Sequence, residues 1–343
     1  MEKWQTNPEK HEKNIGAFIT YTLNGTDILE KISRRYSDFY ALYEKLVQRW
    51  PGVYIPRIPP KLIAKNTSAD IEARVTKQLN NTQEGIRLIT PEPRVKLIAH
   101  RGLEYYAPEA TIPAYTIAGQ KGMWGCKLDI CETADGKFVM SHDTTVDRMF
   151  DGTGSIISKT LEQLQGLTVD AGNHIEDYPN EKIVTLEEAL VICKKYGMHP
   201  YIEFKNIVNK TSVQNVLDII EKQGLLEATC YQCSDGNRNY MYWLRSLNKD
   251  IPIVFWKSSN ITEGTYSHII EPLGNALFSY TATMLVDESV PQQVSIDHGL
   301  PIATAINASL SGAKNLVENY AVSLIVTDRV TPAELAPEIY PVE

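Results

Sequence analysis

The sequence predicts an α/β protein whose main body is a closed parallel barrel of eight β/α units, a (β/α)8 or TIM barrel. Three observations support this prediction. Eight apolar runs of strand length recur from residue 96 onward, helical patterns separate them, and the segment that holds them, residues 95–343, has the size of such a barrel. An open, doubly wound sheet is the less favoured alternative.

The eight apolar runs are short and bounded by polar segments, as buried parallel strands are. In chain order they are KLIAHR, GCKLDI, YIEFK, TCYQCS, PIVFW, ALFSY, PIATAI and SLIVTD. Between them, apolar residues at spacings of three and four predict helices, for example over 186–196 and 213–224. After the second run, Asp135-Gly136 predicts a tight turn into KFVMSHD, so we expect a hairpin insertion there.

Charge divides the chain unequally, although the overall composition is ordinary. With 43% hydrophobic and 22% charged residues and a net charge of −8, disordered and fibrous classes are excluded. Residues 1–94 hold 15 basic and 11 acidic residues, which leaves 19 of the 34 basic and 31 of the 42 acidic residues for the remainder. Pro91 and Pro93 predict an extended linker. We therefore expect an N-terminal domain over 1–90, a linker over 91–94 and a barrel over 95–343.

Targeting signals are not evident in the sequence. No run approaches the roughly 20 apolar residues that cross a bilayer, and residues 1–13 are too polar for a signal peptide. Five cysteines, an odd number in a long chain, do not form a disulfide framework. We expect a cytoplasmic protein without a nucleic-acid partner, and the sequence leaves its oligomeric state open.

The basic N-terminal segment predicts a small α+β unit. Strand-like runs over 17–24 and 27–35 are joined by Asn24-Gly25, a strong hairpin signal. Helical spacing follows over 37–50, then the proline-rich run VYIPRIPPK, then a second helical pattern over 69–79.

Two motifs in this unit resemble the PX (phox homology) domain of sorting nexins. They are RRYSDF at 34–39 and LVQRWPGVYIPRIPPK at 46–61, in the order and spacing of that family. The resemblance covers residues 7–87. It is incomplete, because PX domains usually continue through two further helices where this chain enters its linker. The segment could therefore serve as a packing or assembly element instead.

The PX resemblance implies binding of phosphatidylinositol 3-phosphate and peripheral association with endosomal membranes. Arg35 then holds the 3-phosphate, Tyr36 stacks under the inositol ring, and Lys61 takes another phosphate. The later arginine of that family corresponds to Arg74. A guanidinium that grips phosphate with two parallel bonds and an ammonium point charge suit this chemistry. A solvated basic face without a ligand is the alternative.

Polar residues collect where the predicted barrel strands end, which is where barrel enzymes carry their chemistry. They are His100, Arg101, Asp129, His142, Asp143, Glu203, Lys205 and Asp328. Imidazoles exchange protons near neutral pH, and cations stabilise charge on phosphoryl oxygens. This set favours phosphodiester cleavage over carbonyl or sugar chemistry.

Five ordered motifs resemble the glycerophosphodiester phosphodiesterase family over residues 95–332. They are HRG with PEAT at 100–111, LDICETADGKFVMSHDTTVDRMFDGTG at 128–154, VTLEEAL at 184–190, IEFK at 202–205 and VTDR at 326–329. The resemblance implies release of sn-glycerol 3-phosphate and an alcohol from a glycerophosphodiester. It also implies that His100 and His142 are the acid–base pair and that Arg101 and Lys205 hold the phosphate. We expect Glu109 to support the first loop and Asp328 to orient its neighbours.

Lys127 departs from this family, which carries Glu-x-Asp on the second strand as part of a site for a divalent cation. Here the strand reads Cys126-Lys127-Leu128-Asp129, so only Asp129 and Glu203 remain as ligands for Mg²⁺ or Ca²⁺. An ammonium cannot ligate a hard cation. Three outcomes stay open: weak metal binding, an ammonium in place of the metal, or loss of activity. Strand alternation places Lys127 and Asp129 on one face, which makes the second geometrically reasonable.

The sequence therefore leads to a glycerophosphodiesterase with a membrane-binding module, and two alternatives remain. One is a non-catalytic binding or assembly protein whose barrel is disabled by Lys127. The other is an enzyme of bacterial or phage type that acts on polyglycerol-phosphate teichoic acid, with the PX similarity a remote one.

Overall fold

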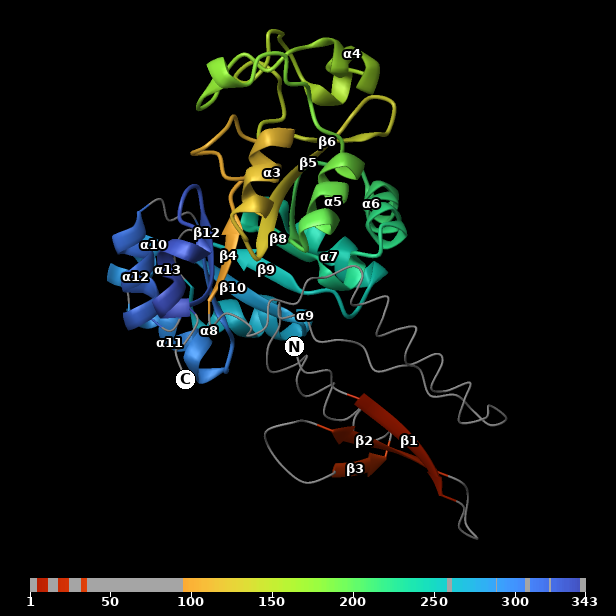
Figure 1. Ribbon diagram of the computed structural model, residues 1–343, viewed down its shortest axis with the longest axis vertical. Coiled ribbons are helices and arrows are strands. Elements are labelled where there is room, and N and C mark those ends of the chain that lie inside the picture. Colours follow the sequence, from red (N-terminus) through yellow and green to blue (C-terminus); the bar gives the residue numbers. More distant parts are fainter. Residues whose placement is uncertain are drawn as a thin grey trace. The chain divides into compact units, whose positions relative to one another are not determined.

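The computed structural model describes residues 5–11, 18–24, 32–35, 95–257, 261–287, 289–305, 309–320 and 322–339. The chain divides into two compact units (Figure 1). No helix in the described ranges is both long and apolar enough to cross a membrane.

The C-terminal unit is a closed barrel of eight parallel strands, as predicted. Around the barrel each strand pairs with the next in the order β4-β12-β11-β10-β9-β8-β7-β5, and a pairing of β4 with β5 closes the ring. The strands are β4 (Lys96–Ala99), β5 (Gly125–Glu132), β7 (His199–Asn206), β8 (Cys230–Ser234), β9 (Ile253–Trp256), β10 (Ala276–Thr281), β11 (Ile302–Ala305) and β12 (Val322–Thr327). Each of the eight apolar runs therefore forms one barrel strand.

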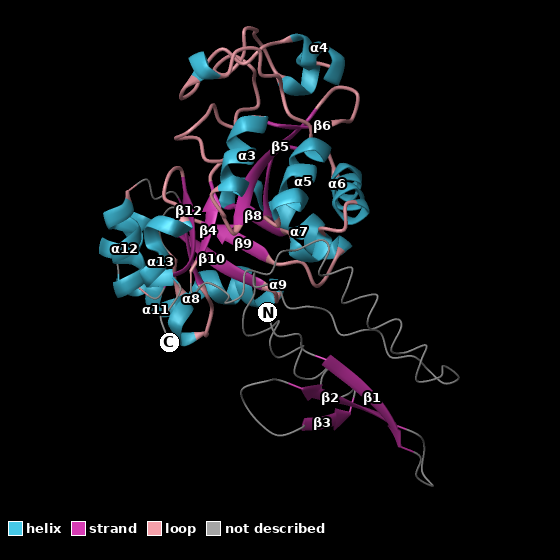
Figure 2. Ribbon diagram, in the orientation of Figure 1, coloured by secondary structure: helices cyan, strands magenta, loops and turns pink. Residues whose placement is uncertain are grey.

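Helices connect successive strands and cover the outside of the barrel (Figure 2). They are α3 (Ile112–Gln120), α5 (Leu186–Tyr196), α6 (Lys210–Lys222), α7 (Arg238–Leu247), α8 (Glu263–Thr265), a π-helical turn (Tyr266–Ile270), α9 (Glu271–Leu273), α10 (Ala282–Asp287), α11 (Ser289–Asp297), α12 (Leu310–Asn319) and α13 (Pro332–Ile339). A further helix, α4 (Leu161–Gly166), lies in the segment that follows β5 and does not cover the barrel. The helix predicted at 186–196 is α5, begun by a capping box of Thr185 with Glu188 and ended by Gly197 in the left-handed conformation. The helix predicted at 213–224 begins earlier, at Lys210, because the Asn209 side chain caps it.

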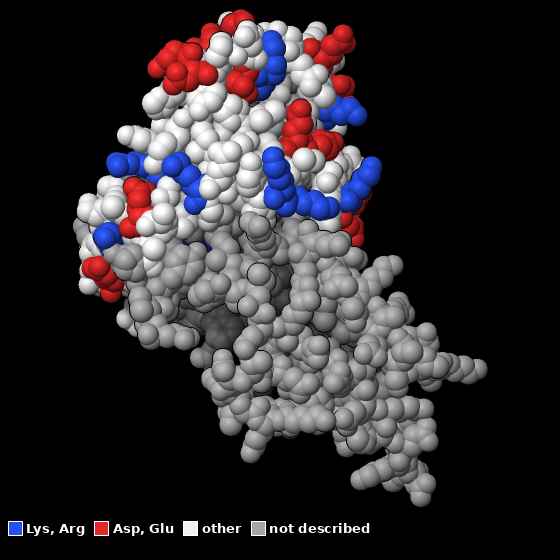
Figure 3. Space-filling model, viewed as in Figure 1, with Lys and Arg blue, Asp and Glu red and all other residues white. Residues whose placement is uncertain are grey.

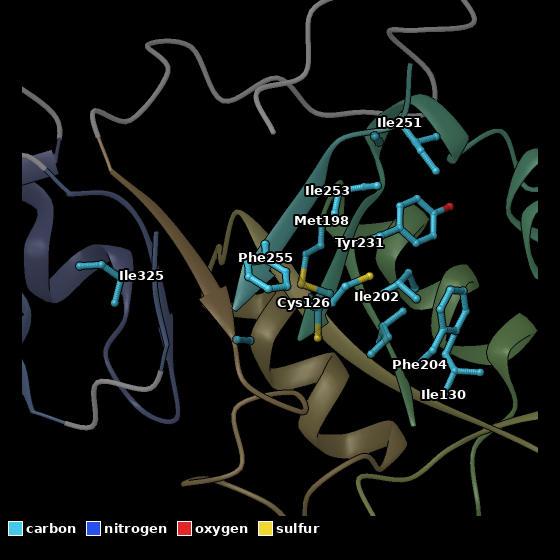
Figure 4. Packing of buried hydrophobic residues seen from close by; sticks show 14 of the residues in the cluster. Cys126, Ile130, Met198, Ile202, Phe204, Tyr231, Ile251, Ile253, Phe255 and Ile325 are labelled. Carbon is cyan, nitrogen blue, oxygen red and sulfur yellow. The ribbon is translucent and has the colours of Figure 1, made fainter. Parts of the chain in front are cut away.

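Two apolar layers surround the strands of the barrel. The outer layer lies between strands and helices, and Figure 4 shows Cys126, Ile202, Phe204, Tyr231 and Phe255 packed in it. The inner layer fills the barrel with Ile98, Trp124, Tyr201, Cys230, Val254, Leu277, Ala303, Leu324 and Val326. Because side chains on a strand alternate, the residues two places further along these strands also point inward, and several of them are charged.

The predicted hairpin insertion is also present. Strand β6 (Phe138–Met140) pairs antiparallel with the end of β5. The segment that follows, with α4, packs around a separate small core of Cys131, Val139, Val146, Met149, Phe150, Ile156, Leu164, Val169 and Ile183. The insertion is therefore a packed subdomain at the carboxyl end of β5.

The N-terminal unit contains an antiparallel sheet in the order β1-β2-β3. Its strands are β1 (Gln5–His11), β2 (Phe18–Asn24) and β3 (Ile32–Arg35), so both predicted strands are present, the second of them over its last four residues. Strand β1 was not predicted, because QTNPEKH has no apolar alternation and contains Pro8, which suits an edge strand. The predicted helices at 37–50 and 69–79 and the linker at 91–94 lie outside the described residues, and the domain limits stay predictions.

The loop after β4 has a strained backbone. Arg101 and Ala110 have φ angles of 51° and 57°, and the Ala110 amide donates to the Arg101 carbonyl over 2.8 Å. Gly102 has φ of 81°, and a Cβ there would lie 2.6 Å from the backbone of Ala114 in α3. Non-glycine residues in the left-handed region cost about 1–3 kcal/mol and cluster at functional sites. The loop therefore requires glycine at residue 102.

We expect Gly102→Ala to lower the free energy of unfolding by about 2–4 kcal/mol, since it combines an unfavourable φ with an overlap against α3. Urea denaturation followed by circular dichroism measures this. Gly136→Ala is the matched control, because Gly136 has φ of 70° but a Cβ there would meet no atom within 4 Å. Equal losses for the two variants would contradict the proposed overlap.

Candidate active site at the carboxyl end of the barrel

The structure brings the predicted barrel residues together at the carboxyl ends of adjacent strands. His100 directly follows β4, and Asp328 directly follows its neighbour β12. Asp129 and Glu203 are register partners on β5 and β7. Because all these strands are parallel, their carboxyl ends meet at one end of the barrel.

His100 is buried and hydrogen-bonded to a carboxylate. Its Nδ1 lies 2.6 Å from Asp328 Oδ1 and 3.6 Å from Glu104 Oε1. Burial lowers the pKa of His100, but the hydrogen bonds to these carboxylates outweigh it, and the pKa lies above its ordinary value. With Nδ1 engaged, Nε2 is the nitrogen left to meet a substrate. The hydrogen bond to Asp328 is the contact that an orienting role of this carboxylate requires.

His142 has a similar pairing on the hairpin insertion but is more exposed. Its Nδ1 lies 2.8 Å from Asp143 Oδ1. Partial burial lowers the pKa of His142, the Asp143 carboxylate opposes this, and the charges of Lys205 and Arg101 lower it further. The pKa of His142 thus lies below its ordinary value, opposite in direction to that of His100. Two histidines whose pKa values are displaced in opposite directions suit a proton donor and a proton acceptor.

Glu109 connects the first loop to the insertion. Its carboxylate accepts a hydrogen bond from Arg101 over 2.9 Å. It also accepts hydrogen bonds from both terminal nitrogens of Arg148, over 2.7 and 3.0 Å. Arg148 Nε also contacts Asp143 at 2.5 Å. This chain of charged contacts runs from the loop that carries Arg101 to the residue that holds His142. Glu109 thus contacts both the first loop and the insertion.

Four charged side chains form a compact cluster inside the barrel. Lys127 contacts Asp129 Oδ1 and lies 2.6 Å from Glu203 Oε2. Lys205 lies 2.6 Å from Glu203 Oε1 and 3.5 Å from Asp129 Oδ1. Gln232 donates to Glu203 Oε2 over 2.7 Å. Lys127 is 4% exposed and Asp129 1%, so their charges are compensated by each other and not by bulk water.

Within this cluster, Asp129 and Lys127 hold each other in their ionised forms. Burial raises the pKa of Asp129, but Lys127 and Lys205 outweigh it and keep the pKa far below its ordinary value. Burial lowers the pKa of Lys127, but Asp129 and Glu203 raise it above its ordinary value. Asp129 Oδ2 has no hydrogen-bond partner among the described residues and lies 3.5 Å from Arg101 Nε, which also has none.

The residues at the expected cation site do not form a set of ligands for Mg²⁺ or Ca²⁺. Such ions take six or more oxygen ligands from carboxylates, carbonyls and water. Of the three side chains at the expected positions one is an ammonium, and it binds both carboxylates. His100, Glu104 and Asp328 do form a group of potential ligand atoms within 4.8 Å of one another, but there His100 is already hydrogen-bonded to Asp328.

Sequence reasoning did not assign roles to four residues of the site, namely Glu104, Asp143, Arg148 and Gln232. Asp143 and Arg148 lie within the motif at 128–154, and their charges beside His142 were a usable signal. Glu104 follows His100 by four residues in a loop, and Gln232 is an inward-facing residue of an otherwise apolar strand. Only the fold brings these last two to the site.

Most of the residues predicted to bind phosphoinositide lie outside the part of the chain that the structure describes. Arg35 ends β3 and pairs with Thr20 of β2 in backbone register. Tyr36, Lys61 and Arg74 lie outside the described residues. Their grouping remains a prediction.

Fold and site together define a class, a TIM barrel with two histidine–carboxylate pairs and a cluster of cations at the carboxyl ends of its strands. Residues 100–260 match the model of the glycerophosphoryl diester phosphodiesterase family, and residues 27–83 match that of the PX domain. The segment that matches the glycerophosphoryl diester phosphodiesterase family therefore lies within the barrel, and the segment that matches the PX domain precedes it in the chain.

Curated relatives match part of the barrel. A glycerophosphodiester phosphodiesterase 1 of Bos taurus is 39% identical over 132 residues, which are 38% of this chain and 40% of the relative. A glycerophosphodiester phosphodiesterase of Bacillus subtilis is 36% identical over 130 residues, 35% of this chain and 42% of the relative. The chain thus spans about two fifths of the length of these relatives.

Solved structures share the barrel fold at lower identity. A phosphodiesterase of Oleispira antarctica, in complex with the product sn-glycerol-3-phosphate, superposes with a TM-score of 0.60 at 24% identity, covering 68% of this chain and 92% of that one. A structure from Galdieria sulphuraria, described as a glycerophosphodiester phosphodiesterase, has a TM-score of 0.59 at 21% identity. The superposition covers 72% of this chain and 98% of that one. The barrel architecture is therefore that of these proteins.

We expect Asp328→Asn to lower the pKa of His100, because it removes the carboxylate that favours the charged imidazole. Titration of the histidine side chains by NMR measures this directly. The pKa of His142, which is paired with Asp143, serves as the internal control and should not change. A pKa of His100 that stays above its ordinary value in the variant would contradict this account.

Proposed function

We propose that the protein hydrolyses glycerophosphodiesters to sn-glycerol 3-phosphate and an alcohol. The observation that supports this most directly is the pair of histidines held by Asp328 and Asp143 with pKa values displaced in opposite directions. The family match of residues 100–260 supplies the substrate class.

In this proposal His142 is the base and His100 the acid. His142, with its lowered pKa, is neutral near pH 7 and takes the proton of the attacking hydroxyl, from water or from the glycerol itself. A new oxygen–phosphorus bond forms while the bond to the alcohol oxygen breaks. His100, with its raised pKa, gives its proton to that leaving oxygen. If the glycerol attacks first, water then opens the cyclic phosphate.

Arg101 and Lys205 would bind the phosphoryl oxygens. Both lie beside the carboxylates of the cluster, Arg101 near Asp129 Oδ2 and Lys205 near Glu203 Oε1. Fixed cations of this kind stabilise the charge that builds on phosphoryl oxygens in the transition state. The barrel as a whole carries more acidic than basic residues and does not attract an anionic phosphodiester. The phosphate would therefore be recognised by these nearby cations. Figure 3 shows acidic side chains gathered over the insertion loops around α4.

We expect purified protein to release sn-glycerol 3-phosphate from glycerophosphoethanolamine or glycerophosphocholine, measured by a coupled glycerol-phosphate assay. His100→Ala and His142→Ala should each lower kcat/KM by about 10²- to 10⁴-fold, the usual contribution of acid–base catalysis. His174→Ala, at an exposed histidine of the insertion, is the control. Turnover of polyglycerol phosphate alone would favour the teichoic-acid alternative, and turnover of neither substrate would favour a non-catalytic barrel.

For the N-terminal domain we propose binding to phosphatidylinositol 3-phosphate through Arg35, Tyr36, Lys61 and Arg74, which would bring the barrel to endosomal membranes. The PX match over residues 27–83 and the excess of basic residues in this segment support it. The negative headgroup and the guanidinium of Arg35 are complementary in charge and geometry.

We expect the full chain to sediment with phosphatidylcholine vesicles that contain phosphatidylinositol 3-phosphate and not with vesicles that lack it. Arg35→Ala should abolish this preference because it removes the bidentate phosphate contact. Lys13→Ala, which removes one charge outside the motif, is the control. Undiminished sedimentation of Arg35→Ala would count against lipid binding and favour an assembly role.

A further inference from the structure

Lys127 is a buried charged residue of the site to which the proposed reaction gives no role. We infer that Lys127 is a built-in cation that replaces a divalent metal in this barrel, so that the site works on side-chain cations alone. Its part in substrate binding rests on the proposed function above, whereas its effect on metal binding can be measured without turnover.

The first support is that every oxygen of the two carboxylates faces a side-chain cation. Asp129 Oδ1 contacts Lys127, and Asp129 Oδ2 lies 3.5 Å from Arg101 Nε. Glu203 Oε2 lies 2.6 Å from Lys127, and Glu203 Oε1 lies 2.6 Å from Lys205. A metal ion between the carboxylates would have to displace these contacts to reach its ligands.

The second support is charge. Asp129 and Glu203 together carry two negative charges, and Lys127 and Lys205 carry two positive ones. Arg101, which pairs with Glu109 over 2.9 Å, is a third cation and lies 3.5 Å from Asp129. A divalent ion would enter a site whose negative charge is already balanced, among three cations that repel it. Replacing Lys127 by a carboxylate would instead leave three negative charges around two cations.

The third support is the position of Lys127 along its strand. Lys127 precedes Asp129 by two residues on β5, so both side chains point into the barrel and the lysine starts deeper. Its flexible stem carries the ammonium up to the level of Asp129 and Glu203, where it is buried. The contacts with these carboxylates use two of the three ammonium donors, and the third can meet a phosphoryl oxygen.

The test is calorimetric titration of the full chain with CaCl₂ and with MgCl₂, for wild type, Lys127→Glu and Lys249→Glu. Lys249 is an exposed residue of the segment that leads into β9, at the opposite end of the barrel, and its variant has the same change in charge. We expect no saturable binding by wild type or Lys249→Glu. Lys127→Glu should bind at least one of the ions with affinity higher by about tenfold or more, because carboxylate number sets affinity in such sites.

Thermal unfolding provides a second readout, since a ligand that binds the folded state raises Tm with its concentration. Added CaCl₂ or MgCl₂ should raise the Tm of Lys127→Glu but not that of wild type. If Lys127→Glu does not fold, Lys127→Gln keeps an oxygen ligand without a third negative charge and should show a smaller gain. The inference would be wrong if wild type bound Ca²⁺ or Mg²⁺ at micromolar concentrations. It would also be wrong if neither Lys127 variant bound these ions more tightly than wild type.

Activity then separates this inference from the proposed function. If wild type hydrolyses glycerophosphodiesters and a chelator leaves the rate unchanged, the result supports both the proposed function and the replacement of the metal by Lys127. Activity that a chelator abolishes overturns the built-in cation and leaves the proposed function intact. If wild type is inactive in every buffer and only Lys127→Glu gains metal binding, the proposed function is wrong. The replacement of the metal by Lys127 is then still supported.

Discussion

Compensation of buried charge is the constraint on which this site depends. Asp129 and Glu203 are register partners on adjacent strands, so the pairing of β5 with β7 brings a buried carboxylate and a partly buried one together. Two such charges are tolerated only when cations of good geometry accompany them, and removing one partner from a buried pair costs about 3–5 kcal/mol. Lys127 and Lys205 meet this requirement from within the chain. The same contacts fix the side chains around which a phosphate is proposed to bind.

The two histidines show how a single residue type serves two roles through its surroundings. His100 is enclosed by the barrel and paired with carboxylates of its own loop and of the residue that follows β12. His142 lies on the insertion near the cations Lys205 and Arg101. Burial lowers the pKa of both histidines, so the difference between their pKa values comes from the nearby charged groups. Arg101, which the strained loop after β4 carries, lowers the pKa of both histidines, so the carboxylates beside His100 set the two pKa values apart.

Much of the barrel could be predicted because buried parallel strands and their helices have distinctive patterns. All eight strands, the hairpin insertion and the helix at 186–196 follow from apolar periodicity and turn residues. Strand β1 could not be predicted, since its polar sequence resembles a loop. In the site, strand alternation correctly put Lys127 beside Asp129. Gln232 and Glu104 could not be predicted, because their approach depends on neighbours that are distant in sequence or on an irregular loop.

The insertion has a core of its own, and this has an evolutionary consequence. Its apolar cluster is separate from the two layers of the barrel, while His142 stands at the boundary and the Arg148–Glu109 contact joins the two bodies. Substitutions inside the small core can tilt or shift the insertion without loosening the barrel's own packing. The spacing between the two histidines can therefore change through substitutions in a minor part of the chain, independently of barrel stability.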